Sequence, residues 1–132
     1  LIEGIAYGTE NIFRSFRQQG YAVQEVVASG GPTKSAFWMQ IHADVSNVPI
    51  TLTEAGDSAA LLGCAALACV GAGVYPDPQA ATSVMVRKTR TIEPNLERHQ
   101  QYQFFVDQYV ATYPQMADLM HTMTRHVAAG RS

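Results

Sequence analysis

The sequence predicts an α/β protein in which helices and buried strands alternate over residues 1–94 and a helical tail covers residues 95–132. Three observations favour this class. Residues 2–18 have helical apolar spacing, a glycine turn joins an apolar strand to a second helix near residue 30, and the tail repeats apolar residues every three or four positions. Alternation of this kind is typical of a layer with parallel strands.

Composition limits the functions that the chain can have. Its 132 residues amount to one domain, and 47% hydrophobic with 15% charged residues is typical of a globular protein. A net charge of −2 argues against nucleic-acid binding, and the apolar run 59–74 is too short and too rich in glycine to span a membrane. Cys64 and Cys69 lack metal-ligand spacing, so we expect buried thiols in a reducing compartment.

The first half of the chain gives two helices and two strands. Gly20 ends the first helix, and the run 26–28 is expected to be a strand buried on both sides. A helix over residues 34–46 and a strand over 48–53 follow. The expected inner faces are Ile2, Ile5, Ala6, Ile12, Phe13 and Phe16 in the first helix, and Phe37, Trp38, Ile41 and Val45 in the second.

The next helix is apolar on every side, which predicts that other elements enclose it. Asp57 is its expected N-cap and residues 71–73 its end. Gly63 in its interior indicates a close approach by another element or by a nucleotide. Pro78 then begins a short helix that runs to about Val86.

The tail predicts either one helix over residues 95–125 or two helices joined near Pro114. Its apolar stripe is expected to serve packing rather than ligand binding. The stripe comprises Tyr102, Phe105, Val106, Tyr109, Tyr113, Met116, Met120 and Met123.

The glycine turn at residues 29–35 is the strongest functional signal. Gly30 and Gly31 allow the backbone to approach a ligand closely, and the following helix directs its free N–H groups and positive dipole end toward the turn. This arrangement suits a nucleotide. An ordinary βα connection explains the same residues, so both interpretations stay open on the local pattern.

Other candidate chemistry finds little support. The side chains of Asp44, Asp57, Asp107 and Asp118 lie on predicted helices or caps and are expected to be structural. His42 is expected to be packed or half-exposed. The remaining histidines, His99, His121 and His126, lack zinc-ligand spacing, and no nucleophile motif of a hydrolase occurs.

Several separated segments together resemble the C-terminal nucleotide-binding region of the FGGY family of carbohydrate kinases. The resemblance is carried by residues 29–45, 48–50, 54–55 and 62–66, then by 71–75, 99–104 and 1–7. Within the family, residues 42–45 and the Tyr113, Pro114 and Met116 tail are most similar to the ribulokinase and pentulose kinase branch.

The resemblance implies part of a ribonuclease H-like domain of the actin, hexokinase and Hsp70 superfamily, with residues 1–132 as a C-terminal portion. It implies transfer of the γ-phosphoryl of ATP, with Mg²⁺, to a sugar hydroxyl, and a cytoplasmic enzyme. Gly30 and Gly31 would lie against the adenosine, Ser35 would contact the base, and Lys34 would reach a phosphate or extend into solvent. Pro32 departs from the small residue common in the family and lacks an N–H.

The resemblance also implies what this chain does not supply. The phosphate loop, the sugar-binding residues, most of the Mg²⁺ site and the catalytic base would all precede Leu1, so the chain alone is expected to be inactive. Two alternatives stay open: a free-standing α/β nucleotide-binding or assembly module, and an interaction domain that docks through the Met-rich face of residues 113–123. The tail helix would serve intrachain packing or a homodimer.

Overall fold

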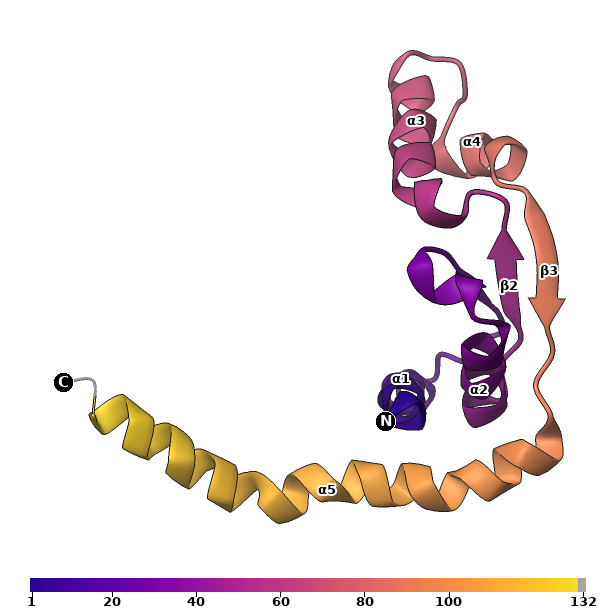
Figure 1. Ribbon diagram of the computed structural model, residues 1–132. Helices are drawn as coiled ribbons and strands as arrows, with labels where there is room; N and C mark the ends of the chain where they lie inside the picture. The colour runs from indigo at the N-terminus through magenta and orange to yellow at the C-terminus, as the bar shows by residue number, and fades with distance from the viewer. Residues whose placement is uncertain (131–132) are drawn as a thin grey trace.

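The computed structural model describes residues 1–130 and forms a small sheet with helices around it (Figure 1). The elements are α1 (Ile2–Gln18), β1 (Val26–Ala28), the 3-10 turn η1 (Gly31–Lys34), α2 (Ala36–Ser46), β2 (Ile50–Thr53), the 3-10 turn η2 (Gly56–Ser58), α3 (Ala59–Gly71), α4 (Pro78–Met85), β3 (Lys88–Ile92) and α5 (Leu96–Ala129).

The sheet within these residues has the order β1-β2-β3. β1 and β2 are parallel, with Val26 opposite Ile50, which confirms the expected pairing. β3 runs antiparallel to β2, with Ile92 opposite Ile50. The sequence analysis missed β3 because four of its five residues are exposed lysine, arginine and threonine. An edge strand needs no apolar run, so hydrophobic periodicity does not reveal it.

The packed body lies where α1, α2, the sheet and the first half of α5 meet. One cluster joins Ala6 of α1, Ile41 and Val45 of α2, and Val106 of α5. A second cluster lies between α2 and the sheet and contains Met39, Ala43, Ile50 and Ile92. α2 therefore packs on two opposite faces, against the sheet on one side and against α1 and α5 on the other (Figure 1).

Several residues expected in the core are exposed. Val27 in β1 is 51% exposed, so the prediction of a strand buried on both sides is wrong for this chain. Phe37 of α2 is exposed as well. Four of the six apolar residues predicted for the inner face of α1 are also open to solvent: Ile2, Ile5, Ile12 and Phe16. Within residues 1–130, no element covers these faces, although their sequence pattern is that of packed surfaces.

The prediction for α3 is wrong in the same way. Of its residues only Ala66 is buried, and Leu61 is 74% exposed. A Cβ built at Gly63 would meet no atom within 4 Å, so the expected close approach does not occur within this chain. Cys64 is exposed and Cys69 half-buried, contrary to the expected buried thiols.

The boundaries of α3 correct one cap. Asp57 lies in η2 rather than at the helix N-cap, which is Ser58 and makes no side-chain cap hydrogen bond. The predicted end of the helix is confirmed, because α3 stops at Gly71 and Gly73 follows with φ of 74°. The predicted helix that begins at Pro78 is confirmed as α4.

The tail is one helix, α5, and Pro114 lies inside it. Its beginning is fixed by Asn95, whose side chain accepts a hydrogen bond of 2.9 Å from the N–H of Arg98. The second half of α5 extends away from the body (Figure 1). None of the helices in residues 1–130 combines the length and the apolarity that crossing a membrane requires.

Candidate functional site

The glycine turn adopts a backbone conformation that only glycine takes readily. Gly30 has φ of 89° and ψ of −173°, in a region that side chains exclude. η1 follows directly. The N–H of Thr33 donates a hydrogen bond of 3.1 Å to the Gly30 carbonyl and closes the turn. The Thr33 hydroxyl donates to the same carbonyl over 2.7 Å. The turn is therefore a fixed shape rather than a loose loop.

A second turn lies against the first. η2 follows β2 as η1 follows β1, so both turns stand at the carboxyl ends of the parallel strands. The Gly30 N–H donates to the Gly56 carbonyl over 3.1 Å, and the Lys34 Nζ lies 2.5 Å from the Asp57 Oδ2. The carboxyl edge of parallel strands is where open α/β sheets bind ligands.

The beginning of α2 points into this edge. Ser35 is the N-cap, and its Oγ accepts a hydrogen bond of 3.2 Å from the N–H of Trp38. The hydroxyl proton of Ser35 remains free to be donated. The first turn of a helix carries N–H groups without an intrahelical acceptor, and these groups and the helix dipole favour an anion or an acceptor atom of a ligand.

The four residues predicted to bind the cofactor lie together in this edge. Gly31 has open space around it, since a Cβ there would meet no atom within 4 Å. Lys34 is 72% exposed in its side chain, yet it is paired with Asp57. The Gly30 N–H is used internally, so Gly30 would contact a ligand by close approach and not by donating a hydrogen bond.

Gly56 and Asp57 also belong to this candidate site, because they contact Gly30 and Lys34, although the local sequence pattern does not predict them there. The local pattern favours a helix cap at Asp57 and gives no functional signal at Gly56, whose φ is 44°. The signal was available: a short apolar strand, 50–53, is followed by a glycine-containing turn and a helix, as at residues 26–36. Parallel strands bring two such turns to the same edge.

The other end of α2 is occupied by structural contacts. Asp44 is 2% exposed, and its Oδ1 accepts hydrogen bonds from the Asn95 N–H at 2.7 Å and from Gln40 Nε2 at 2.8 Å. Its Oδ2 accepts from Arg98 Nε over 2.6 Å. His99 Nδ1 lies 3.1 Å from the carbonyl oxygens of both Asp44 and Val45. The expectation of a structural role for Asp44 agrees with these contacts.

The remaining titratable groups of residues 1–130 do not gather into a metal site. No three His, Cys, Asp or Glu side chains gather there in a way that could hold a metal ion. His42 is half-exposed, as expected, and burial holds its pKa below the usual range of histidine. Asp107 forms an ion pair with Arg14 at 2.7 Å and so joins α5 to α1.

Comparison with known proteins decides the family. Residues 1–72, more than half of the chain, match the model of the C-terminal domain of the FGGY family of carbohydrate kinases. The chain belongs to the FGGY family. This confirms the resemblance on residues 29–45 and 62–66, and it places the glycine turn in the family's C-terminal domain.

Relatives of this FGGY chain extend the match into the tail. A xylulose kinase of Staphylococcus epidermidis is 32% identical over 90% of this chain and 24% of its own length. An autoinducer-2 kinase of Escherichia coli strain K12 is 37% identical over 75% of the chain and 19% of its own length. The chain therefore spans about a quarter of the curated relatives it matches.

Solved structures show the same relationship. The crystal structure of xylulose kinase from Rhodospirillum rubrum has a TM-score of 0.72 and 28% identity to this FGGY chain, over 92% of the chain and 24% of that protein. This match confirms the expected fold class, the actin and hexokinase-like fold of FGGY kinases, of which the chain forms a C-terminal part.

Proposed function

We propose that this chain is the C-terminal part of an ATP-dependent kinase that phosphorylates a hydroxyl of a pentulose such as ribulose or xylulose. One observation carries the proposal: η1 and η2 form a paired turn at the carboxyl edge of β1 and β2, in front of the N-terminus of α2. The chain supplies the adenosine side of the nucleotide site.

The residues of the turn fit an adenine nucleotide. Open space around Gly31 allows the adenosine to lie against the backbone, and the Ser35 hydroxyl is able to donate a hydrogen bond to a ring nitrogen of the base. Lys34 would contact a phosphate if its ion pair with Asp57 opens. Exposed ion pairs contribute only about 0–1 kcal/mol, so this exchange is accessible.

The chemistry of phosphoryl transfer divides between this chain and the rest of a longer kinase. Mg²⁺ bound to the phosphates neutralises the charge of the transferred group. The residues described here bind and orient the nucleotide. The carboxylate that accepts the sugar proton, the phosphate loop and most of the Mg²⁺ ligands would belong to other parts of the polypeptide, together with the sugar site.

The choice of a pentulose rests on relatives. Proteins similar to this chain include xylulose kinases, which supports the pentulose branch. An autoinducer-2 kinase is similar as well, so autoinducer-2 is the competing acceptor substrate. Assay of the complete kinase with ATP against pentuloses and against autoinducer-2 separates these two classes.

The proposed kinase also has an expected domain organisation, cellular location and assembly. Residues 1–94 would complete an α/β nucleotide-binding domain, and residues 95–132 would form its helical tail. A kinase that consumes ATP and small sugars is expected in the cytoplasm. The tail helix is available for a homodimer, because its second half leaves the body.

Gly31→Val in the complete kinase tests the nucleotide site directly. A Cβ at this position meets no atom within 4 Å in the described residues, but the valine side chain would occupy the space proposed for adenosine. We expect the KM for ATP to rise roughly 10-fold or more, with the KM for the sugar nearly unchanged and the thermal unfolding temperature preserved. An unchanged KM for ATP would contradict the assignment and favour a non-catalytic module in which the turn serves packing.

A further inference from the structure

A polar cavity of about 310 Å³ lies at the junction of α1, α2 and α5. Its wall includes Val23 and Val48, which precede β1 and β2, so the cavity stands at the amino ends of the parallel strands. The glycine turn lies at the opposite, carboxyl edge of the same strands. We call this space the α1–α5 cavity. Its polar wall residues include Glu10, Arg14, Arg17, Ser46, His99 and Gln103.

Two buried polar atoms in this wall have no hydrogen-bond partner within residues 1–130. Glu10 is 1% exposed, and its Oε1 accepts hydrogen bonds from Arg14 Nε, at 3.2 Å, and from Arg17. The other carboxylate oxygen, Oε2, accepts none, and the Oγ of Ser46, a residue 5% exposed, is unpaired as well. Buried polar atoms are rarely left unpaired, so two of them in one cavity indicate that a further group binds there.

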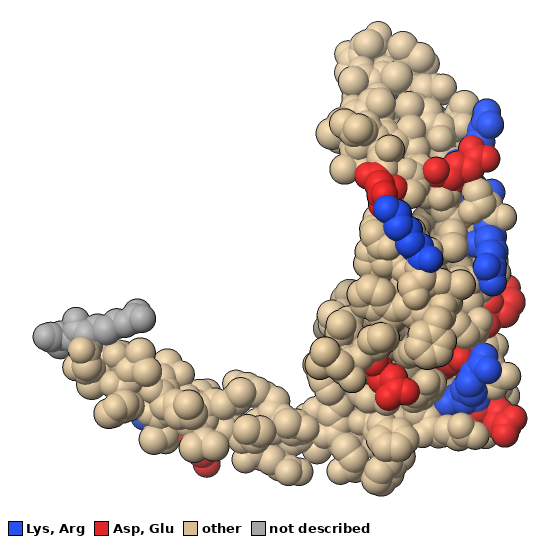
Figure 2. Space-filling view, in the orientation of Figure 1, with Lys and Arg blue, Asp and Glu red and all other residues tan. Residues whose placement is uncertain are grey.

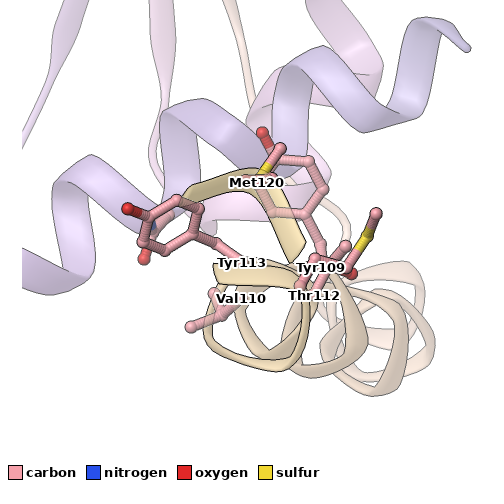
Figure 3. Close-up of a pocket in the computed structure, with 7 residues that line it drawn as sticks. Tyr109, Val110, Thr112, Tyr113 and Met120 are labelled. Atoms are coloured by element: carbon pink, nitrogen blue, oxygen red, sulfur yellow. The ribbon is translucent and has the colours of Figure 1, made fainter. Parts of the chain in front are cut away.

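A second hollow, of the same volume of about 310 Å³, has a different character. On the face that Figure 2 shows, the extended part of α5 is largely uncharged, and most charged side chains lie on the body. Figure 3 shows Tyr109, Tyr113 and Met120, which line this second hollow, projecting from α5. None of the unpaired buried atoms of residues 1–130 belongs to its wall. The unpaired atoms therefore single out the α1–α5 cavity.

The charges around the α1–α5 cavity already balance one another. Arg14 and Arg17 both pair with Glu10, and Arg14 Nη1 lies 2.7 Å from Asp107 Oδ1. An anion would meet the free oxygen of Glu10 and the negative, C-terminal end of α2. A cation would meet two guanidinium groups. The cavity therefore suits a neutral ligand.

The wall requires a ligand that both donates and accepts hydrogen bonds. Glu10 Oε2 only accepts, the guanidinium group of Arg17 only donates, and the Ser46 hydroxyl does either. His99 Nδ1 lies 3.1 Å from two carbonyl oxygens at the end of α2 and so carries the proton, which leaves Nε2 as an acceptor in the neutral ring. A hydroxyl group donates and accepts through a single atom, so hydroxyl groups match this wall.

We propose that the α1–α5 cavity binds a small neutral molecule with several hydroxyl groups, a sugar or a polyol. One hydroxyl donates to Glu10 Oε2 while its oxygen accepts from Arg17, and a neighbouring hydroxyl bonds with Ser46 Oγ. The volume of about 310 Å³ lies at the small end of ligand pockets, which begin at about 300 Å³, and suits a single sugar unit. Binding pairs the two free atoms without adding charge.

The test uses the complete polypeptide that carries this chain, with xylitol and myo-inositol as probes and no nucleotide. Calorimetric titration measures their affinity, and a crystal structure grown with xylitol locates the bound molecule. We expect xylitol in contact with Glu10 and Ser46. Ordered water alone in the cavity would overturn the proposal. A side chain from the rest of the polypeptide that fills the cavity would overturn it too.

Ser46→Ala separates ligand binding from a structural role. It removes a buried hydroxyl that has no partner, so the unfolding temperature without ligand should be unchanged or higher. The affinity for xylitol should nevertheless fall roughly 5-fold, the effect of one lost hydrogen bond. Ser15→Ala is the control, because the exposed Ser15 hydroxyl donates to the Asn11 carbonyl and lies outside the cavity wall. Equal affinity in the two variants would contradict the proposal.

Glu10→Gln tests the other unpaired atom. The amide oxygen still accepts from Arg14 and Arg17, but an NH₂ group replaces Oε2 and the ligand hydroxyl loses its acceptor. We expect the affinity for xylitol to fall roughly 10-fold or more, because hydrogen bonds to a charged group are the stronger ones. Glu97→Gln, in the exposed first turn of α5, makes the same change of charge and should bind xylitol normally.

Inorganic phosphate tests the class of ligand. The balanced charges of the wall predict that phosphate does not displace xylitol. Displacement of xylitol by phosphate in the wild-type protein, and not in the Glu10→Gln variant, would show an anion site and overturn the proposal. These titrations contain no ATP, so failure here is separate from failure of the nucleotide site.

Discussion

The two ends of α2 both gather polar groups, but they use them differently. At the C-terminal end, Asp44 is buried and meets donors from α2, from the 95–98 turn and from α5. At the N-terminal end, Ser35 satisfies the N–H of Trp38, and the pair of Lys34 and Asp57 stands in solvent. Asp44 is committed to structure, and the N-terminal end keeps its hydrogen-bonding groups and its open space for a nucleotide.

The two ends of α2 differ in the hydrogen-bonding capacity that they leave for a ligand. A buried carboxylate whose oxygens are all occupied by donors from other elements has no capacity left for a substrate. An exposed turn with a fixed, glycine-dependent backbone has that capacity, and its shape is established before the ligand arrives. Substitutions of Asp44 at the closed end should therefore change stability alone, whereas substitutions at the open end should also change nucleotide binding.

The largest effect is expected at the closed end. Asp44→Ala removes the acceptor of the Asn95 N–H and of Arg98 Nε, and one of the two acceptors of Gln40 Nε2, which keeps its hydrogen bond to the Glu93 carbonyl. We expect a loss of roughly 3 kcal/mol in the opening free energy of α2 and of the first turns of α5. Hydrogen exchange of the complete kinase measures it.

The matched control for Asp44→Ala is Asp118→Ala. Asp118 lies on the exposed second half of α5. Its replacement should change the opening free energy by less than about 0.5 kcal/mol. If Asp44→Ala instead left hydrogen exchange unchanged and abolished catalysis, Asp44 would be part of the reaction centre and the division between the two ends would fail.

The next effect concerns the open end and depends on backbone conformation alone. Gly30→Ala places a Cβ on a residue with φ of 89° and ψ of −173°, which should destabilise the turn by about 1–3 kcal/mol. Gly31→Ala, one residue later and outside the positive-φ region, is the control and should cost well under half of that. Differential hydrogen exchange of residues 29–36 distinguishes them, and equal effects would mean that the turn is not fixed as described.

A smaller effect is expected for the cap of α2. Ser35→Ala removes the acceptor of the Trp38 N–H and should cost about 1 kcal/mol of local stability. Ser35→Asp restores an acceptor and should recover most of that stability, but its negative charge would oppose the phosphates and it has no proton to donate to the base. A variant that regains stability without regaining ATP affinity would show that Ser35 has both roles, whereas parallel recovery of the two would leave only the cap.

The sequence predicted the bounds of the helices better than it predicted which of their faces are buried. The boundaries of α1, α3 and α4 follow from periodicity, glycine and proline, which act locally. β3 was not predicted, because an exposed edge strand of lysine, arginine and threonine has no apolar pattern. The apolar faces of α1 and α3 have the spacing of packed surfaces, so the sequence predicts that they are buried. Within residues 1–130 no element covers these faces, and they are exposed.

The site was predicted in part for a similar reason. Gly30, Gly31, Lys34 and Ser35 are adjacent in the chain, so a local motif identified them together. Gly56 and Asp57 join them only because β1 and β2 pair in parallel, which brings a second turn to the same edge. Asp57 satisfied the local rule for a helix cap, but in the structure it lies in η2 and pairs with Lys34.

The smallest effect lies midway along α2 and depends on pH. Burial lowers the pKa of His42, whose ring lies 5.9 Å from that of Trp38, so the folded protein binds the proton less readily than the unfolded chain does. The stabilisation is present above the unfolded pKa and is lost as the pH falls toward the lower folded value. His42→Gln should therefore flatten the decline of stability between about pH 7 and pH 5 by a few tenths of a kcal/mol. Thermal unfolding across this pH range measures the effect, and His121→Gln, on the exposed half of α5, is the control. An equal change in the pH dependence of stability in both variants would show that His42 is not its cause.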